Sequence, residues 1–108
     1  MRLVNRHLLI EFINKHSDCR SSIASLINEF ENSNWASSQD IKLTYPKASI
    51  IGGKCVVFNI KGNKYRLVAK INYSLNKKAG VIKIMWAGTH KEYDKLDLRR
   101  TLCLEKKL

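Results

Sequence analysis

Two groups of side chains in the second half of the chain can bind a phosphate and move a proton. The first group gathers amide and basic side chains in one short stretch: Asn59, Lys61, Lys64, Arg66 and Lys70. The planar guanidinium of an arginine can hold two phosphate oxygens at once, and a lysine acts beside it as a point charge. The second group is the run THKEYD at residues 89–94, in which the imidazole of His90 can carry a proton near neutral pH.

The first group falls on one face of a predicted β-hairpin. Gly62 and Asn63 are a typical two-residue turn, because the turns that close such hairpins need positive φ angles and both residues tolerate them. This turn places Asn59 opposite Arg66. Side chains alternate between the two faces of a strand. The other face is therefore a predicted core face of five residues: Phe58, Ile60, Tyr65, Leu67 and Ala69.

In the same register Lys61 lies opposite Lys64, with Arg66 two residues further along the same face. Like charges directly opposite each other destabilise a sheet. A negatively charged partner would relieve that repulsion. The alternative is an ordinary solvated face of lysines at the end of a hairpin.

Members of the second group have structural alternatives as well. His90 can cap the end of a strand, Tyr93 can be a core residue of a last helix, and Asp94 can be a surface charge. Trp35, outside both groups, can be a stacking platform. Because large aromatic side chains are usually buried, we predict that Trp35 belongs to the core.

The charge of the chain is strongly positive and lies mainly in its second half. The 108 residues include 20 Lys and Arg against 9 Asp and Glu, a formal net charge of +11. Residues 55–108 hold 13 of the basic and 4 of the acidic residues, a net charge of +9. This imbalance points to nucleic acid, an acidic protein or an anionic membrane as partner. Membrane is the weakest of the three, because the sequence predicts neither a basic amphipathic helix with a large apolar face nor an apolar run of about 20 residues.

Length and cysteine content are typical of a small intracellular domain. We predict a single domain over residues 1–108. The three cysteines, Cys19, Cys55 and Cys103, are far apart, and no CxxC or Cys/His spacing indicates a metal site. We therefore expect reduced thiols and no metal. The first residues lack a signal-peptide pattern, so we expect a cytoplasmic protein.

Hydrophobic periodicity predicts an α+β fold, with helices packed on one face of a small, mostly antiparallel sheet. Helices are expected at residues 5–16, capped by Asn5, then up to about residue 32, and at residues 91–98. At most one short helical turn, capped by Ser38, is expected near residues 38–43. Residues 1–4 are a candidate edge strand, residues 50–51 a strand before the hairpin, and residues 81–87 a strand after it. In that last strand, Ile82, Ile84 and Trp86 are apolar while Lys83 faces the other way.

Four segments, in this order, resemble the HigB toxin family of the RelE-like superfamily of bacterial toxin–antitoxin systems. They are WASSQDIK at residues 35–42, YPKAS at 45–49, VFNIKGNKYRL at 57–67 and GTHKEYD at 88–94. The likeness covers about residues 12–96. The third and fourth blocks in their right order are specific, whereas either one alone is weak.

The resemblance implies a compact toxin of the RelE-like fold that enters the ribosomal A site and cuts mRNA there. Such toxins work without metal or cofactor and usually make the 2′-OH of the mRNA attack the adjacent phosphate. The family also implies a HigA-type antitoxin with a helix-turn-helix domain, through which alone the toxin reaches operator DNA. These partners place the protein in the bacterial cytoplasm.

Residue roles follow from matched positions and from side-chain chemistry. Arg66 matches the strand arginine of the YRL motif, His90 stands where many RelE-like toxins have a basic residue, and Tyr93 follows it; these three are the candidate catalytic residues. The candidate RNA- and phosphate-binding residues are Asn59, Lys61, Lys64, Lys70 and Asp94.

A noncatalytic basic module that binds RNA, the ribosome or an acidic protein is the alternative to a nuclease. Small RNA-binding domains usually stack bases on aromatic residues of a sheet. The exposed face of this predicted hairpin offers lysines and an arginine instead, which favours contacts with phosphate.

Overall fold

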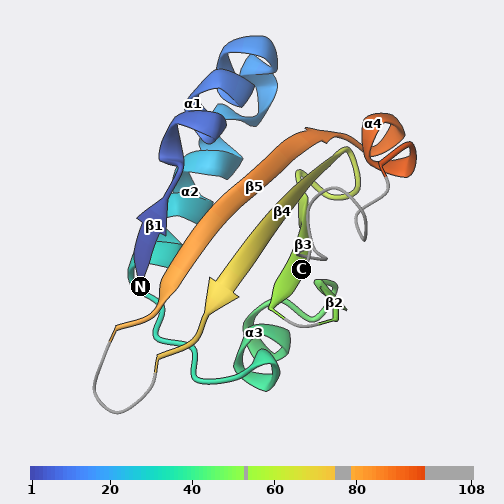
Figure 1. The fold of residues 1–108 in the computed structure, drawn as a ribbon. Helices are drawn as coiled ribbons and strands as arrows, with labels where there is room; N and C mark the ends of the chain where they lie inside the picture. The colour runs from blue at the N-terminus through green and yellow to red at the C-terminus, as the bar shows by residue number, and fades with distance from the viewer. Residues whose placement is uncertain (53, 75–78, 97–108) are drawn as a thin grey trace, which may run out of the picture.

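A computed structural model describes residues 1–52, 54–74 and 79–96 (Figure 1). Five strands and four α-helices, with a 3-10 turn η1, follow one another along the chain. They are β1 (Arg2–Val4), α1 (Arg6–Lys15), η1 (Ser17–Cys19), α2 (Arg20–Glu31), α3 (Ser38–Thr44), β2 (Ser49–Ile51), β3 (Cys55–Ile60), β4 (Tyr65–Asn72), β5 (Val81–Thr89) and α4 (His90–Asp94). None of the helices in the described ranges is long and apolar enough to cross a membrane.

The strands form one sheet in the order β1-β5-β4-β3-β2. Strand β1 runs parallel to β5 at one edge, and every other neighbouring pair is antiparallel. Helices α1, α2 and α3 pack their buried side chains into the main core cluster together with one face of the sheet. The predicted α+β class, the mostly antiparallel sheet and the edge strand at residues 1–4 are therefore confirmed.

The main core is rich in aromatic residues. Phe30, Phe58 and Trp35 are buried, and their ring centroids lie 5.0 to 6.2 Å apart. Trp35 is only 4% exposed, which confirms it as a core residue. Burying a side chain of this size stabilises the fold by about 1.5–3 kcal/mol.

The predicted hairpin register is confirmed, but its turn differs. Asn59 pairs with Arg66 as expected, yet the ladder stops at Ile60 and Tyr65, so the connection is the four-residue loop 61–64. Positive φ angles fall on Lys61 (53°) and Gly62 (68°) rather than on Gly62 and Asn63. The two lysines therefore belong to a loop and do not face each other across the ladder.

A β-bulge in β5 overturns the predicted placement of Trp86. Val68 pairs with Trp86 and Ala69 with Ile84, so Met85 is the extra residue. A bulge moves the following side chains to the other face. Trp86 consequently leaves the face of Ile84 and packs against the smaller cluster around Val68.

Helix ends also depart from expectation. Asn5 precedes α1, but its left-handed backbone (φ 67°) offers no side-chain cap, and its amide donates to the Ile84 carbonyl at 3.0 Å. The short helix α3 is longer than one turn, and its N-cap is Ser37 instead of Ser38. Helix α4 runs from His90 to Asp94, so it begins one residue earlier than predicted and does not extend over residues 95–96; residues 97–98 lie outside the described residues.

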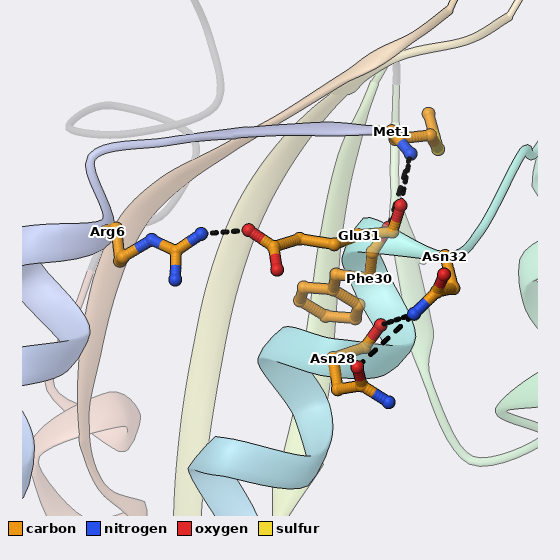
Figure 2. Close-up of polar contacts among 6 residues, drawn as sticks. All are labelled: Met1, Arg6, Asn28, Phe30, Glu31 and Asn32. Carbon is orange, nitrogen blue, oxygen red and sulfur yellow. Dashed lines mark hydrogen bonds and ion pairs between the residues drawn. The ribbon is translucent and has the colours of Figure 1, made fainter.

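Contacts around the end of α2 hold the helical layer together (Figure 2). The α-ammonium of Met1 donates to the carbonyl oxygens of Glu31 (3.1 Å) and Ser33 (2.7 Å). A positive charge is favourable at a helix C-terminus, where unpaired carbonyls gather. Arg6 forms an ion pair with the side chain of Glu31. Strand β1 and helix α1 are thereby tied to the same end of α2.

The cysteines are only partly as expected. Cys19 is a buried free thiol, as predicted. Cys55 is disulfide-bonded, which contradicts the expectation of reduced thiols throughout. Cys103 lies outside the described residues.

Candidate functional site

The candidate site lies on the face of the sheet turned away from the main core, which we call the second face. Strand alternation assigns to it, among others, Cys55, Val57, Asn59, Arg66, Val68, Lys70, Trp86 and Gly88. Its middle is a small apolar cluster that includes Val57 and Val68, with Trp86 and Tyr93 packed against it. Tyr93 comes from α4, so α4 closes one end of this face.

Arg66 lies at the end of the second face nearest to α4. Its guanidinium carbon is 5.7 Å from the centre of the Tyr93 ring. Its Nη1 donates to the Asn63 carbonyl at 3.2 Å. The cation–π contact and the backbone acceptor hold the guanidinium between the hairpin loop and α4. This brings together two of the three predicted catalytic residues.

His90 and Asp94 form a second pair on α4. The His90 Nε2 is 3.3 Å from an Asp94 carboxylate oxygen, and both side chains are partly exposed, at 39% and 60%. Residues four apart on a helix are neighbours, so Asp94 can orient the imidazole. The Thr89 side chain accepts from the Glu92 backbone N–H, and the Glu92 side chain accepts from that of Thr89. This capping box fixes where α4 begins and thus where His90 stands.

A backbone hydrogen bond ties the start of α4 to the hairpin loop. The His90 N–H donates to the Lys64 carbonyl at 3.1 Å, which anchors the start of α4 on the hairpin loop. Asn59 is exposed on the strand next to Arg66, directly across the ladder. Arg66, Tyr93, His90 and Asn59 therefore converge at one end of the sheet.

Two further residues shape this end and were not singled out from the sequence. The ring of Trp86 lies 6.3 Å from that of Tyr93, on the face to which the bulge moves it. Gly88 is the ladder partner of Arg66, and a Cβ there would lie 2.5 Å from the Trp86 ring. Glycine at position 88 therefore leaves the space that Trp86 fills beside Arg66. A strand glycine before a polar run was the only signal for this role.

The prediction that Lys61 and Lys64 lie on the second face is wrong. The Nζ of Lys64 is 2.7 Å from a carboxylate oxygen of Asp18, and the Nζ of Lys61 donates to the Asp18 carbonyl at 2.9 Å. Tyr65, on the core face, donates its hydroxyl to the other Asp18 carboxylate oxygen at 2.6 Å. We call these four residues the Asp18 cluster. Their loop position frees the lysines to turn toward η1.

The Asp18 cluster shifts the pKa values of its members in a consistent way. Hydrogen bonds from Lys64 and Tyr65 lower the pKa of Asp18 to about 2. The same contacts raise the pKa of Lys64 and of Tyr65, because each donates to the carboxylate. Asp18 is 46 or more residues away from Lys64 and Tyr65. Nothing in the local sequence indicates that it holds the hairpin loop.

Lys70 lies at the opposite end of the second face from Arg66. It is half-buried and pairs across the ladders with Cys55 and Lys83. Four residues along a strand separate it from Arg66 by about 13 Å. Lys70 can therefore contact only a ligand that extends along the face.

Two hollows flank the site. One, of about 580 Å³, lies between the hairpin loop and the connection from α3 to β2, and Asn59 lines it. We call it the β3 groove. The other, of about 360 Å³, lies beside β5 and is lined by Lys15 and His16 of the α1 end and by Trp86. Within residues 1–52, 54–74 and 79–96 no group of three His, Cys, Asp or Glu side chains is arranged to hold a metal ion.

Comparison with known proteins identifies the family of the chain. No curated protein matches the chain in sequence. A family model described as HigB_toxin, RelE-like toxic component of a toxin-antitoxin system, matches residues 19–96. The match covers most of the chain and includes the hairpin, β5 and α4. The chain therefore belongs to the HigB toxin family, and it is a RelE-like toxic component of a toxin–antitoxin system.

Proposed function

We propose that this toxin is an endoribonuclease that cleaves mRNA in the ribosomal A site, by attack of a 2′-OH on the adjacent phosphate. Family membership supports a toxin that acts on RNA. The observation that carries the proposal is the convergence of Arg66 and Tyr93 with the His90–Asp94 pair at one end of the sheet.

The reaction has three chemical needs that these side chains can meet. A base takes the proton of the 2′-OH, a cation stabilises the charge that grows on the phosphate, and an acid gives a proton to the leaving 5′-oxygen. Arg66 supplies the cation, since its fork can hold two phosphate oxygens. His90 carries a proton, and Asp94 orients it. Tyr93, beside Arg66, stacks on a base or positions a proton.

The remaining candidates bind the RNA backbone. Asn59 lies across the ladder from Arg66 and can contact the nucleotide next to the reacting phosphate. Lys70 binds the RNA backbone further along the second face. Lys61 and Lys64 reach a phosphate only when they leave Asp18, so substrate binding competes with the Asp18 cluster.

Membership of the family implies an antitoxin as partner. We propose that it is of the HigA type, with a helix-turn-helix domain that carries the complex to operator DNA. Ribosome and mRNA are the other partners, and the bacterial cytoplasm is the place of action. Neither a metal nor another cofactor is part of the proposed mechanism.

Induced expression in a bacterium, with and without the antitoxin, tests the class. Growth arrest that the antitoxin relieves is expected, together with new 5′ ends in mRNA at the A-site codon of stalled ribosomes. The matched variant is Arg66→Ala, which should abolish both. Arrest that persists with intact mRNA would support the noncatalytic basic module instead.

A further inference from the structure

The β3 groove is a hollow of about 580 Å³ beside the candidate site, and the proposed mechanism places no reacting group in it. Its floor is apolar and aromatic, with Phe58, Tyr45 and Ala48 among the residues that line it. The hairpin loop forms one wall and the α3–β2 connection the other. Asn59 belongs both to this groove and to the second face. A ligand bound in the groove therefore contacts Asn59, which lies across the ladder from Arg66.

One edge of the sheet is unpaired at this groove. Strand β2 pairs only with residues 55–57 of β3, so residues 58–60 have no strand beside them on that side among the described residues. The Ile71 N–H of β4 donates to the carbonyl of Lys54, so the peptide groups of residue 54 face β4. Peptide groups alternate between the two sides of a strand, so the even-numbered residues of β3 also face β4. The N–H and C=O of Asn59 therefore point away from β4, toward the groove.

Charge and exposure around the groove indicate a protein partner. Lys47 is the only charged residue that lines it among the described residues, and the chain as a whole carries a net charge of +11. Leu43 directly precedes Thr44 of the groove lining and is 82% exposed, an unusual position for a large apolar side chain at the end of a helix. An acidic chain segment with an apolar side chain matches both features.

We propose that the β3 groove is the docking site of the antitoxin. An extended, acidic segment of the antitoxin adds to the free end of β3, pairs with the outward peptide group of Asn59 and places an apolar side chain in the groove. Strand addition of this kind gives affinity through main-chain hydrogen bonds and specificity through side-chain pockets. Because Asn59 lies across the ladder from Arg66, the docked segment also bars RNA from the candidate site.

A nucleobase of the substrate is the competing occupant. The groove volume of about 580 Å³ exceeds what one flat base fills, and its lining offers a single cation. The exposed Leu43 beside it has no use for a base. These observations favour the protein segment.

Affinity for the antitoxin, measured with purified full-length toxin, tests the proposal. Leu43→Asp and Lys47→Glu should each weaken binding about 10- to 100-fold, the scale of residues at the centre of an interface. The matched controls are Ile10→Asp, an exposed apolar residue of α1, and Arg20→Glu, the same charge reversal on α2. Both controls should bind as the parent protein does. An Arg66→Ala background permits expression without arrest.

Hydrogen exchange tests the strand addition itself. The Asn59 amide should exchange at least about 10-fold more slowly in the complex with the antitoxin. If Leu43→Asp does not fold, Thr44→Arg on the same wall should weaken binding in its place. Unchanged affinity of the groove variants, or an Asn59 amide that stays unprotected, would overturn the proposal.

Cleavage is read separately from affinity. Leu43→Asp should cut RNA at the parental rate and should resist neutralisation by the antitoxin. Loss of RNA binding with unchanged antitoxin affinity would assign the groove to the substrate and overturn the proposal. A protein that does not cleave RNA at all would refute the proposed function but leave the affinity result intact.

Discussion

Arg66 is the residue on which the proposed chemistry depends most. We expect Arg66→Ala to lower the single-turnover rate of mRNA cleavage on ribosomes about 10²–10³-fold, the scale of losing one group that stabilises an oxyanion. Arg66→Lys should recover little, because a point charge cannot reproduce the fork. Arg20→Ala, a change of the same type on α2, should leave the rate unaltered. A near-parental rate for Arg66→Ala would mean that the site lies elsewhere.

His90 is expected to act on protons rather than on binding. His90→Ala should slow cleavage about 10²–10⁴-fold and remove a pH-dependent limb from the rate profile. Ribosome binding should persist. An unchanged rate and pH profile would leave His90 as the first residue of a capped helix, and proton transfer would fall to Tyr93, a lysine or ribosomal RNA.

Single residues differ in how far the sequence reveals them. Arg66 opposite Asn59 follows from alternation on both sides of a glycine turn, a local pattern. Asp18 holds the same loop from the far side of the fold, and no local pattern connects it with Lys64. The prediction for Lys61 and Lys64 was therefore wrong both in their direction and in their place opposite each other in the ladder, whereas the register of Asn59 and Arg66 was right.

At the scale of elements, the Asp18 cluster fastens the hairpin loop to η1. The folded state lowers the Asp18 pKa to about 2 from an ordinary value of 3.8. The contribution of the ionised Asp18 side chain to the stability of the fold is thus complete above about pH 5 and disappears as the pH falls toward 2. Asp18→Asn should lower the free energy of unfolding at pH 7. The difference from the parent protein should disappear in acid, where the parent's Asp18 is protonated. Urea unfolding between pH 7 and 2 measures the difference.

The exposed carboxylate of Glu11 on α1 provides the control for this experiment. Glu11→Gln removes the same charge from the helical layer without touching the hairpin loop. Its effect on stability should stay small across the pH range. A gap between parent and Asp18→Asn that does not narrow in acid would show that packing, and not the charge on Asp18, fastens the loop.

Elements were predicted well where periodicity is regular and poorly where it breaks. The hairpin strands and the first two helices follow from spacings of two and of three to four residues. The bulge at Met85 changes the phase in the middle of β5, and an alternation rule carried through it places Trp86 on the wrong face. Helix α3 exceeds its predicted single turn because packing buries Ile41 completely.

For the whole molecule, the charge asymmetry predicts how binding depends on salt. Residues 55–108 carry a net charge of +9. Each phosphate contact on single-stranded RNA contributes about −0.7 to the slope of log affinity against log salt, so three or four contacts give roughly −2 to −3. Titrations of a short RNA between low and moderate salt measure it. A flat response would indicate an apolar partner in place of RNA.

The α+β class and the placement of the helices on one face were accessible from the sequence because they depend on hydrophobic patterns alone. The parallel pairing of β1 with β5 was not, since a three-residue edge strand carries no signal for its partner. The β3 groove could not be predicted either, because it arises where β2 is too short to pair with residues 58–60 of β3.

The pairing of β1 with β5 determines when the sheet can be completed during synthesis. Arg2 pairs with Val81, so the first strand waits for the fifth. At 5–20 residues per second, roughly 4 to 16 s separate the translation of these two partners. His90 and Asp94 follow later still. Until these residues have been translated, a nascent chain therefore has neither a closed sheet nor the candidate site, and the activity proposed for that site cannot begin earlier.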